Sequence, residues 1–534
     1  MPTPPPSNDG QWYLAIDLGT GGVKVAAVLP DGEVVADQFS AIETRHGADG
    51  GALQDPADWW LAIHDCMLAV TGSGRVDPQR CCGVGITGQW GSTVPVDSSG
   101  NPVGPCLLWS DDRGAALSAS LVGGGVNVQG LNVRKAAAWV RMTGGMPSPG
   151  GADPTGHAQF LRVHEPEMYG ATATLLEPVD YIGLLLTGRV AATPASMVLS
   201  WLTDNRPGAP MAYVPSLVRL ARREASKLPT LLPTGSTLGP LKPETARLFG
   251  FPLDLPVVCG IPDLHTAWLG SGAVDDYNGH IAISTTAWVS ASVPFKRTDA
   301  LRSIASIPSV LPGSYLIANN HDTGGACLRW FREQILGGAF DERGEHGAAP
   351  SYDEITAMAA SSAVGAGGVI FTPWLKGERS PVDDRNLRAA FLNVSLRTNR
   401  ADLARAVLEG VAYNARWLLD ASEKFAKRKL SPLRILGGGA QSELWCQIHA
   451  DVIGRPVERV ESPLHTNVRG AAQFAALALG HCTLNDIAAN SRIQQRYEPD
   501  LRAHTIYEPL YREFIKLAAS QKKMYRRLNG NGVN

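Results

Sequence analysis

The sequence predicts a mixed α/β protein made of two lobes built on the same plan. A strand, a small-residue turn and a second strand open the chain at residues 13–35, and the same plan returns at residues 279–295. The two units lie too far apart to be neighbours in a solenoid repeat, so each is expected to begin a lobe of its own. Helices at 400–428 and a strand at 433–439 then close the second half.

Bulk composition excludes several classes of function. The chain has 534 residues, 44% of them apolar, which is enough for two lobes with sizeable cores. A net charge of −2 offers no basic surface for nucleic acid or for an anionic membrane, so small molecules are the expected partners. No apolar run approaches the roughly 18 residues of a membrane span.

Cysteine usage and the first residues indicate where the protein works. The cysteines are scattered without a C-x-x-C pair, as expected for a reducing, cytoplasmic location. The opening "MPTPPPSNDG" has neither a charged segment nor an apolar segment, so residues 1–11 are predicted to be a disordered tail rather than a signal peptide.

The first strand–turn–strand unit, "YLAIDLGTGGVKVAAVLPDGEVV", carries an aspartate, Asp17, into a glycine-rich turn. Asp31-Gly32 is a hairpin signal, so the unit is predicted to be a β-hairpin and not a βαβ unit. The segment also lacks G-x-G-x-x-G and GK[ST], which argues against Rossmann and Walker loops.

The turn itself suits a phosphate. Backbone N–H groups around Gly19 and Thr20 could hold one, with the Thr20 hydroxyl and the Lys24 ammonium nearby. Asp17 would repel a phosphate directly, and a divalent cation such as Mg²⁺ between them resolves the conflict. The alternative is an ordinary hairpin with a solvated acid.

Two later segments add to this interpretation. "STTAWVS" places Thr285 and Thr286 in a second small-polar turn, and two facing turns would hold a nucleotide's phosphates from both sides. "ILGGGAQSELW" is a strand, a triple glycine and a helix; bare backbone at Gly438 and Gly439 permits close approach of a ring or ribose. A plain strand-to-helix turn is the alternative.

A helix and two buried strands complete the first half. Residues 55–70 have the pattern of an amphipathic helix, with Asp55 as N-cap and Pro56 at the first helical position. The apolar runs 81–89 and 255–263 are typical of buried strands, and the second ends on Asp263. A carboxylate held at a strand end could accept the proton of an alcohol as it attacks a phosphoryl group. An N-cap for the following helix is the alternative role.

As a set, "DLGTGGVK", "STTAW", "GGGAQSELW" and "LARAVLEGVAYN" resemble the FGGY carbohydrate kinases of the actin-like ATPase superfamily, in their xylulokinase-like branch. The resemblance covers nearly the whole chain. It implies two RNase-H-like lobes with a cleft between them: an N-terminal sugar-binding lobe at 12–270 and a C-terminal nucleotide-binding lobe at 271–534. Asn393 departs from the family pattern, where glycine is usual, and so do His157 and Phe160.

The resemblance implies a role for each candidate residue. Asp17 matches the aspartate that organises Mg²⁺ and phosphate, Gly19 and Thr20 the first phosphate loop, and Asp263 the catalytic base. The remaining cofactor-binding candidates lie on the second phosphate loop, the adenosine motif and the first hairpin: Thr285, Thr286, Gly438, Gly439, Ala440, Ser442 and Lys24.

The predicted sugar site departs most from the family. The candidates for substrate contact are Gln89, Trp90, Trp109, Asp111, Arg113 and Asp263. Gly91 and Leu264 stand where xylulokinase-like enzymes carry histidine and often asparagine, so two polar contacts to a five-carbon ketose would be missing. D-xylulose is therefore expected to be a modest substrate at best. Glu378 and Arg379 are expected to be scaffold.

The sequence thus predicts an ATP- and Mg²⁺-dependent kinase of a small sugar or polyol. Ribulose, glycerol, erythritol or an alditol are alternative substrates. The alternative of another class is an actin-like nucleotide switch or a catalytically inactive sugar sensor; Asp263 favours the kinase, because a switch needs no base beside a sugar pocket. The oligomeric state stays open, with a homodimer among the choices.

Overall fold

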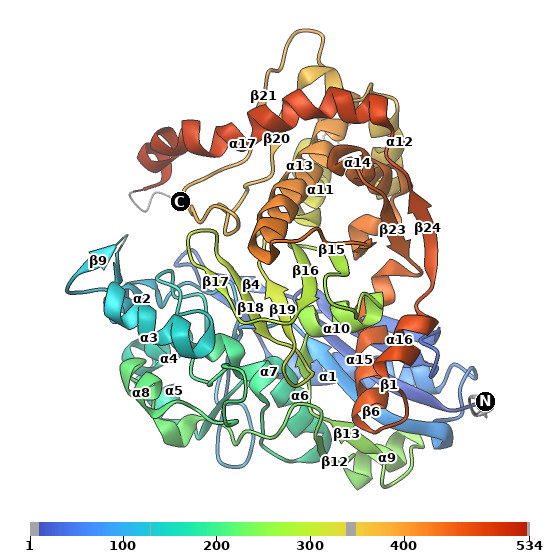
Figure 1. Cartoon of the computed structure of the whole chain (residues 1–534). Coiled ribbons are helices and arrows are strands. Elements are labelled where there is room, and N and C mark those ends of the chain that lie inside the picture. The colour runs from blue at the N-terminus through green and yellow to red at the C-terminus, as the bar shows by residue number, and fades with distance from the viewer. Residues whose placement is uncertain (1–9, 129, 338–348, 531–534) are drawn as a thin grey trace, which may run out of the picture.

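The computed structural model describes residues 10–128, 130–337 and 349–530. It consists of two α/β domains, each built around one large sheet (Figure 1). Most of the predicted tail, residues 1–9, lies outside the described residues, and the first strand begins at Trp12. None of the described helices has the length and apolar character needed to cross a membrane.

The sheet of the N-terminal domain has the strand order β12-β13-β6-β1-β2-β3, with β14 pairing with β6. Its strands are β1 (Trp12–Gly19), β2 (Gly22–Val28), β3 (Val34–Ala41), β6 (Cys81–Gly88), β12 (Thr237–Pro240), β13 (Pro256–Val258) and β14 (Ile261–Pro262). The predicted hairpin is present and continues as a meander: Thr20-Gly21 turns β1 into β2, and the Asp31-Gly32 turn joins β2 to β3. β6 runs parallel to β1, β13 and β14.

The sheet of the C-terminal domain repeats this plan in the order β17-β18-β19-β16-β15-β22-β23-β24. Its strands are β15 (Gly279–Ile283), β16 (Ala287–Val293), β17 (Thr298–Asp299), β18 (Ile304–Pro308), β19 (Tyr315–Ala318), β22 (Leu433–Leu436), β23 (Val457–Val460) and β24 (Ile493–Tyr497). In both sheets an antiparallel hairpin pairs through its first strand with a parallel strand from later in the chain. The prediction of one plan used twice is confirmed.

Short strands lie outside these sheets. They pair as β4 (Arg45–His46) with β5 (Ala52–Gln54) and β8 (Cys106–Leu107), β7 (Val94–Val96) with β11 (Thr174–Leu176), β9 (Asn127–Val128) with β10 (Leu131–Asn132), and β20 (Ile370–Thr372) with β21 (Ala390–Leu392).

The helices divide between the domains along the chain. The N-terminal domain has α1 (Pro56–Thr71), α2 (Ala115–Val122), α3 (Val133–Thr143), α4 (Pro154–His164), α5 (Pro166–Ala171), α6 (Pro178–Thr187), α7 (Pro194–Met197), α8 (Pro215–Leu220), α9 (Pro243–Phe249) and α10 (Asp263–Ser271). The C-terminal domain has α11 (Gly325–Trp330), α12 (Tyr352–Ala360), α13 (Arg400–Ala426), α14 (Glu443–Ile453), α15 (Thr466–Ala478), α16 (Leu484–Asn490) and α17 (Leu501–Asn529). As predicted, Asp55 caps α1 by accepting the Ala57 N–H.

Three buried cores hold these layers together. One lies between the N-terminal sheet and α1, α6 and α9, and another between the C-terminal sheet and α11, α13, α14 and α17. The third joins the two domains, since it contains the inner faces of both sheets together with α10 and α15. The near-continuous apolar run of β1 follows from this, because a strand covered on both faces has no polar side.

Helices α10 and α15 lie between the two sheets. α15 belongs to the C-terminal half of the chain but packs on β1 and β6, whereas α10 contacts β6 and β14 of its own domain and β15 and β16 of the other. Small residues permit this: a Cβ on Gly270 would lie 1.9 Å from the Thr466 carbonyl oxygen, and one on Gly470 would lie 1.9 Å from the Thr266 carbonyl oxygen. The two helices therefore cross backbone to backbone.

We expect Gly470→Val to lower the free energy of unfolding by at least about 2 kcal/mol, because any side chain at the crossing forces the helices apart. Urea unfolding followed by circular dichroism would measure it. Gly170→Ala in α5 is the matched control, since a Cβ there meets open space. A loss of less than about 0.5 kcal/mol in Gly470→Val, within the range of ordinary surface changes, would contradict the close crossing.

Candidate active site

The candidate site lies where three parallel strands of the N-terminal sheet end. Asp17 of β1 stands opposite Thr87 of β6, and Thr87 stands opposite Ile261 of β14. Asp263 follows β14 directly as the first residue of α10. Carboxyl ends of parallel strands meet at one edge of a sheet, and this edge brings the two carboxylates of Asp17 and Asp263 together.

Asp17 is supported from both domains. Its cross-strand partner on β2 is Lys24, and the Asn467 side chain of α15 lies near enough from the other domain to lower the pKa of Asp17. Burial nevertheless raises the pKa of Asp17 to about 6, against the opposing effects of Lys24 and Asn467. The Lys24 ammonium donates to the Leu464 carbonyl 2.9 Å away, so it links the domains as well as facing Asp17.

The pKa of the Asp263 carboxylate is raised more than that of Asp17. Burial, followed by the charge of Asp17, raises the pKa of Asp263 to about 7, and the backbone N–H groups of Leu264 and Asp263 oppose the rise. The first turn of α10 is fixed to the sheet, because the Thr266 hydroxyl lies 2.8 Å from that of Thr87 and 3.1 Å from the Asp263 carbonyl. A carboxylate with a pKa near neutrality is suited to accept a proton.

This pair of carboxylates fits a divalent cation. Their negative charges lie near each other in a half-buried setting, and the Oδ1 atom of Asn467 beside them is buried without a hydrogen-bond partner. Among the described residues no group of three or more His, Cys, Asp or Glu could hold a metal by itself. Mg²⁺ does not require such a group, because it takes one or two carboxylates and completes its shell with water and phosphate oxygens.

The first turn is joined to the predicted sugar residues. The Thr20 hydroxyl accepts from the Trp109 indole N–H at 3.0 Å and donates to the Gln89 Oε1 at 3.4 Å. Sequence reasoning missed a completely buried amide, Gln54, which donates to the Thr20 carbonyl at 2.8 Å and accepts from Gln89 Nε2 at 3.1 Å. Its only sequence signal was its place just before the N-cap of α1.

Asp111, predicted to contact substrate, has its carboxylate engaged within the protein. Asp111 is fully buried, and its carboxylate accepts from the Ala52 backbone N–H at 3.0 Å and from Arg113 Nη2 at 2.6 Å. Both oxygens are occupied, so its role is to fix Arg113. The guanidinium of Arg113 lies 4.3 Å from the centre of the Phe160 ring, and His157 hydrogen-bonds to the Asp111 carbonyl. His157 and Phe160, which depart from the family pattern, thus support the pair formed by Asp111 and Arg113.

The loop after β6 is tightly held. The Trp90 indole N–H donates to the Ser196 carbonyl at 2.8 Å, and its ring meets the His265 ring edge-on with centroids 5.9 Å apart. Gly91 has φ +82°, a conformation that side chains rarely adopt, and a Cβ there would approach Leu199 to 3.1 Å. A histidine at position 91 would therefore strain this backbone. Leu264, in place of the family's asparagine, packs into the core between the domains.

The C-terminal domain contributes two facing loops. Thr285 is exposed, and its carbonyl accepts from the backbone N–H of Gly324 at 2.9 Å. Gly437 and Gly439 pack so closely on Ile283, at the end of β15, that a Cβ on either would lie within 2.6 Å of it. Gly438 is left exposed between them. The Ser442 hydroxyl is already engaged, since it caps α14 by accepting the Trp445 N–H at 3.2 Å.

The loop after β20 is anchored by buried polar contacts. Glu378 is fully buried; its Oε2 lies 2.7 Å from Asn414 Nδ2 and 3.0 Å from His321 Nδ1. Arg379 approaches buried Asp322 at 3.3 Å. These contacts agree with the expectation that Glu378 and Arg379 are scaffold.

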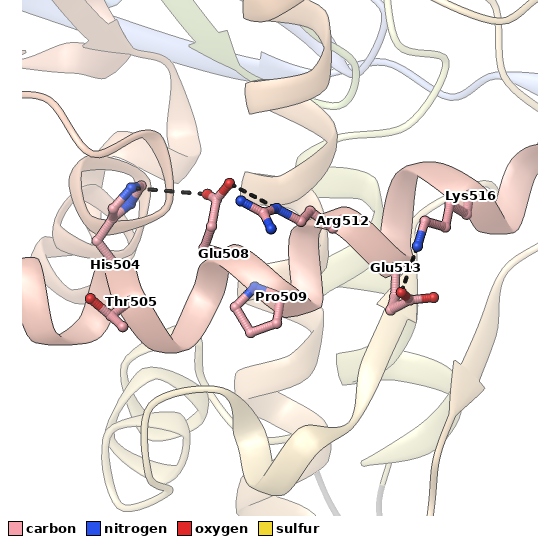
Figure 2. A pocket seen from close by; sticks show the side chains of 7 residues that line it. All are labelled: His504, Thr505, Glu508, Pro509, Arg512, Glu513 and Lys516. Atoms are coloured by element: carbon pink, nitrogen blue, oxygen red, sulfur yellow. Dashed lines mark hydrogen bonds and ion pairs between the residues drawn. The ribbon is translucent and has the colours of Figure 1, made fainter.

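A depression of about 550 Å³ lies elsewhere, on α17 (Figure 2). Its lining comes from one face of that helix, and its charged side chains pair along it, Glu508 with Arg512 at 3.3 Å and Glu513 with Lys516 at 2.8 Å. α17 crosses the top of the C-terminal domain in Figure 1, whereas β1 lies in the lower domain. The lining of the depression includes neither Asp17 nor Asp263, so the depression is not the candidate site.

Family models account for most of the chain. Residues 12–270 match the N-terminal domain of the FGGY family of carbohydrate kinases, and residues 284–479 match its C-terminal domain. The chain belongs to the FGGY family of carbohydrate kinases. It is therefore an enzyme that phosphorylates a sugar hydroxyl, as the resemblance implied. The left-handed φ of +63° at Asn393 also explains why glycine is usual there in FGGY kinases.

Curated relatives match over nearly their full length. The xylulose kinase of Staphylococcus epidermidis (strain ATCC 12228 / FDA PCI 1200) is 25% identical over 516 residues, covering 96% of this chain and 97% of that protein. The xylulose kinase of Escherichia coli (strain K12) is 27% identical over 508 residues, covering 95% and 98%.

Solved structures confirm the fold. A gluconate kinase from Lactobacillus acidophilus superposes with a TM-score of 0.82 at 20% identity, covering 97% of this chain and all of that one. A xylulose kinase from Rhodospirillum rubrum gives 0.78 at 26% identity, with the same coverage. The predicted fold class, two RNase-H-like domains of the actin-like ATPase type, is thereby confirmed.

Proposed function

We propose that this FGGY kinase transfers the γ-phosphoryl group of Mg·ATP to a hydroxyl of a small sugar or polyol, with Asp263 as the general base. The observation that supports this most is the pair of carboxylates at one sheet edge, of which Asp263 has a pKa of about 7. An alcohol is far too weak an acid to ionise unaided, and a carboxylate of this pKa takes its proton as the new P–O bond forms.

In the proposed reaction each domain binds one of the two substrates. The N-terminal domain binds the sugar beside Trp90, Trp109, Gln89 and the guanidinium of Arg113. The C-terminal domain binds ATP between the loop of Thr285 and Thr286 and the segment Gly438, Gly439, Ala440 and Ser442. Backbone N–H groups at Gly19 and Thr20 bind phosphate from the opposite side.

Asp17 would hold Mg²⁺ in this arrangement. The ion supplies neutralisation of the phosphate charge when it is bound. Lys24 and Asn467 keep the Asp17 carboxylate ionised and oriented, because both lower its pKa against burial. Asp263 is thereby left free to hold the proton that leaves the hydroxyl.

The proposed substrate preference follows from how few polar groups of the predicted sugar residues are free to bind a substrate. Trp90, Trp109, Gln89 and Asp111 already spend hydrogen-bonding groups within the protein, at Ser196, Thr20, Gln54 and Arg113. Relatives are named xylulose kinase, and one is named L-xylulose/3-keto-L-gulonate kinase, so a ketose is the first class to test. With few free polar groups, we propose that another pentulose or a four- or five-carbon polyol is preferred over D-xylulose.

A coupled ADP-release screen over ketoses, aldoses and alditols would test the function. ADP release that depends on one of these compounds, with the phosphorylated product identified by mass spectrometry, is expected. Slow ADP release unaffected by every compound would contradict a sugar kinase and favour a nucleotide switch. A preference for D-xylulose of more than about tenfold over all others would contradict the substrate proposal, since it corresponds to roughly 1.4 kcal/mol of transition-state discrimination.

The pH dependence of kcat/KM should report Asp263 in the free enzyme. The base must be ionised and its pKa is about 7, so kcat/KM is expected to fall tenfold per pH unit below that value and to level off above it. Buffers of matched ionic strength from acidic to mildly alkaline pH, with saturating Mg²⁺, would give the profile. A profile that stays flat down to about pH 5, as an unperturbed carboxylate near pKa 4 would give, contradicts this assignment.

A further inference from the structure

A buried carboxylate lies directly beneath the loop that carries Trp90. Glu177 is only 2% exposed, and its Oε2 accepts from the backbone N–H groups of Gly91 at 3.0 Å and Ser92 at 3.2 Å. Because both N–H groups donate to one oxygen, Glu177 fixes the direction of the backbone at Gly91 and Ser92. No ion pair to Glu177 is present in the described part of the chain, so these backbone donors are its main support.

A second route leads from Glu177 to the same loop. Glu177 is the N-cap residue of α6, and Asp180 in the first turn of α6 is also fully buried. Ser196 lies near enough to Asp180 to oppose the rise in its pKa, and the Ser196 carbonyl receives the Trp90 indole N–H at 2.8 Å. The start of α6 therefore holds the backbone of the loop through Glu177 and lies beside Ser196, the residue that receives the Trp90 side chain.

The loop has little freedom of its own. Gly91 has a left-handed φ of +82°, which an unsupported loop would readily leave. Ser92 receives the Trp109 backbone N–H on its hydroxyl at 2.9 Å, so a shift of the loop moves both tryptophans. One oxygen each of Glu177 and Asp180 is buried without a partner, and burial raises the pKa of both acids well above the usual range. A neutral amide should therefore be tolerated in place of the Glu177 carboxyl.

We propose that Glu177 is a positioning residue for sugar specificity: it holds the backbone of Gly91 and Ser92 and so sets where Trp90 and Trp109 face the sugar. This inference rests on the proposed function, because it takes the two tryptophans as walls of the sugar site. Glu177 itself touches no substrate. Its effect should appear in sugar binding and sugar preference and leave nucleotide binding alone, since its contacts all lie within the N-terminal domain.

Three variants test the proposal on the full-length enzyme, with the best compound of the screen as substrate. Glu177→Leu removes the acceptor and is expected to raise the sugar KM at least about tenfold, with the ATP KM changed by less than about twofold. Glu177→Gln keeps an acceptor oxygen and should restore a sugar KM within about threefold of wild type. Glu177→Asp moves the acceptor back by one methylene and should give a sugar KM between those of the leucine and glutamine variants. If the leucine variant does not fold, the sugar KM of Glu177→Asp tests the proposal in its place.

Glu423→Leu is the matched control, because Glu423 is a buried glutamate that accepts the Leu430 backbone N–H at 3.0 Å in the other domain. It should lower the thermal midpoint without changing the sugar KM. An unchanged sugar KM and sugar preference in folded Glu177→Leu or Glu177→Asp would overturn the proposal, as would equal rises in the KM of sugar and ATP. Failure of the proposed function is distinguishable, since wild type would then release no sugar-dependent ADP.

Discussion

Replacing Asp263 with asparagine is expected to lower kcat by on the order of 10²–10⁴, equivalent to roughly 3–5 kcal/mol of transition-state stabilisation. Asparagine has nearly the same shape but cannot accept the proton of the attacking hydroxyl. The fold should persist, because α10 is held by the Thr266 hydroxyl on Thr87 and not by the Asp263 side chain. Steady-state ADP release with saturating sugar and Mg·ATP measures the loss.

Asp153→Asn is a suitable control for this experiment. Asp153 is a buried acid at the start of α4 whose carboxylate accepts the backbone N–H groups of Thr155 and Gly156. Its replacement should reduce stability and leave kcat nearly unchanged. If Asp263→Asn keeps more than about a tenth of the wild-type turnover, below the usual range for a general base, Asp263 is not the base.

Removal of the Asp17 side chain is expected to have the second largest effect. Asp17→Ala should lower kcat/KM for Mg·ATP by at least on the order of 10²-fold, because a metal ion supplies several kcal/mol of charge stabilisation in such reactions. The required Mg²⁺ concentration should rise in parallel. A titration of Mg²⁺ at fixed ATP, with turnover as the readout, measures both changes.

Sugar binding separates a metal defect from a damaged domain. Calorimetry of the sugar alone should give the same affinity for Asp17→Ala as for wild type, since Asp17 is placed on phosphate and metal. Gln54→Leu provides the contrast, because that amide joins Thr20 to Gln89 and its loss should disturb the sugar residues as well. If sugar affinity falls as much as turnover in Asp17→Ala, the metal role is contradicted.

Much of the fold follows from local sequence. The strand pairs around Asp17 and Thr285 are local, so the glycine-rich turn after Asp17, the small-polar turn at Thr285 and Asp31-Gly32 were sufficient to predict them. Asp263 was predictable because an apolar run ends just before it. Both domains were recognisable because each begins with two strands joined by a short turn of small residues.

The site depends on contacts that no local pattern records. Asp111 sits in a motif that suggests sugar binding, yet its two oxygens are occupied by Ala52 and Arg113, from a distant strand and from two residues along the chain. Asn467 reaches Asp17 only because α15 crosses to the other domain. Glu177 meets Gly91 across 86 positions of the chain. Side chains that are brought together by long-range packing produce no periodic pattern in the sequence, so they could not be predicted from it.

The packing of α15 on the N-terminal sheet has a consequence for how the protein folds during synthesis on the ribosome. The inner face of the first sheet is completed by α15, and the Tyr13 hydroxyl finds its partner, Nδ1 of His481 at 2.7 Å, across 468 residues of chain. Strand β1 leaves the exit tunnel long before α15 does. During synthesis this sheet must wait with an apolar face uncovered until α15 has been made, so the nascent chain is vulnerable to aggregation and proteolysis throughout that interval.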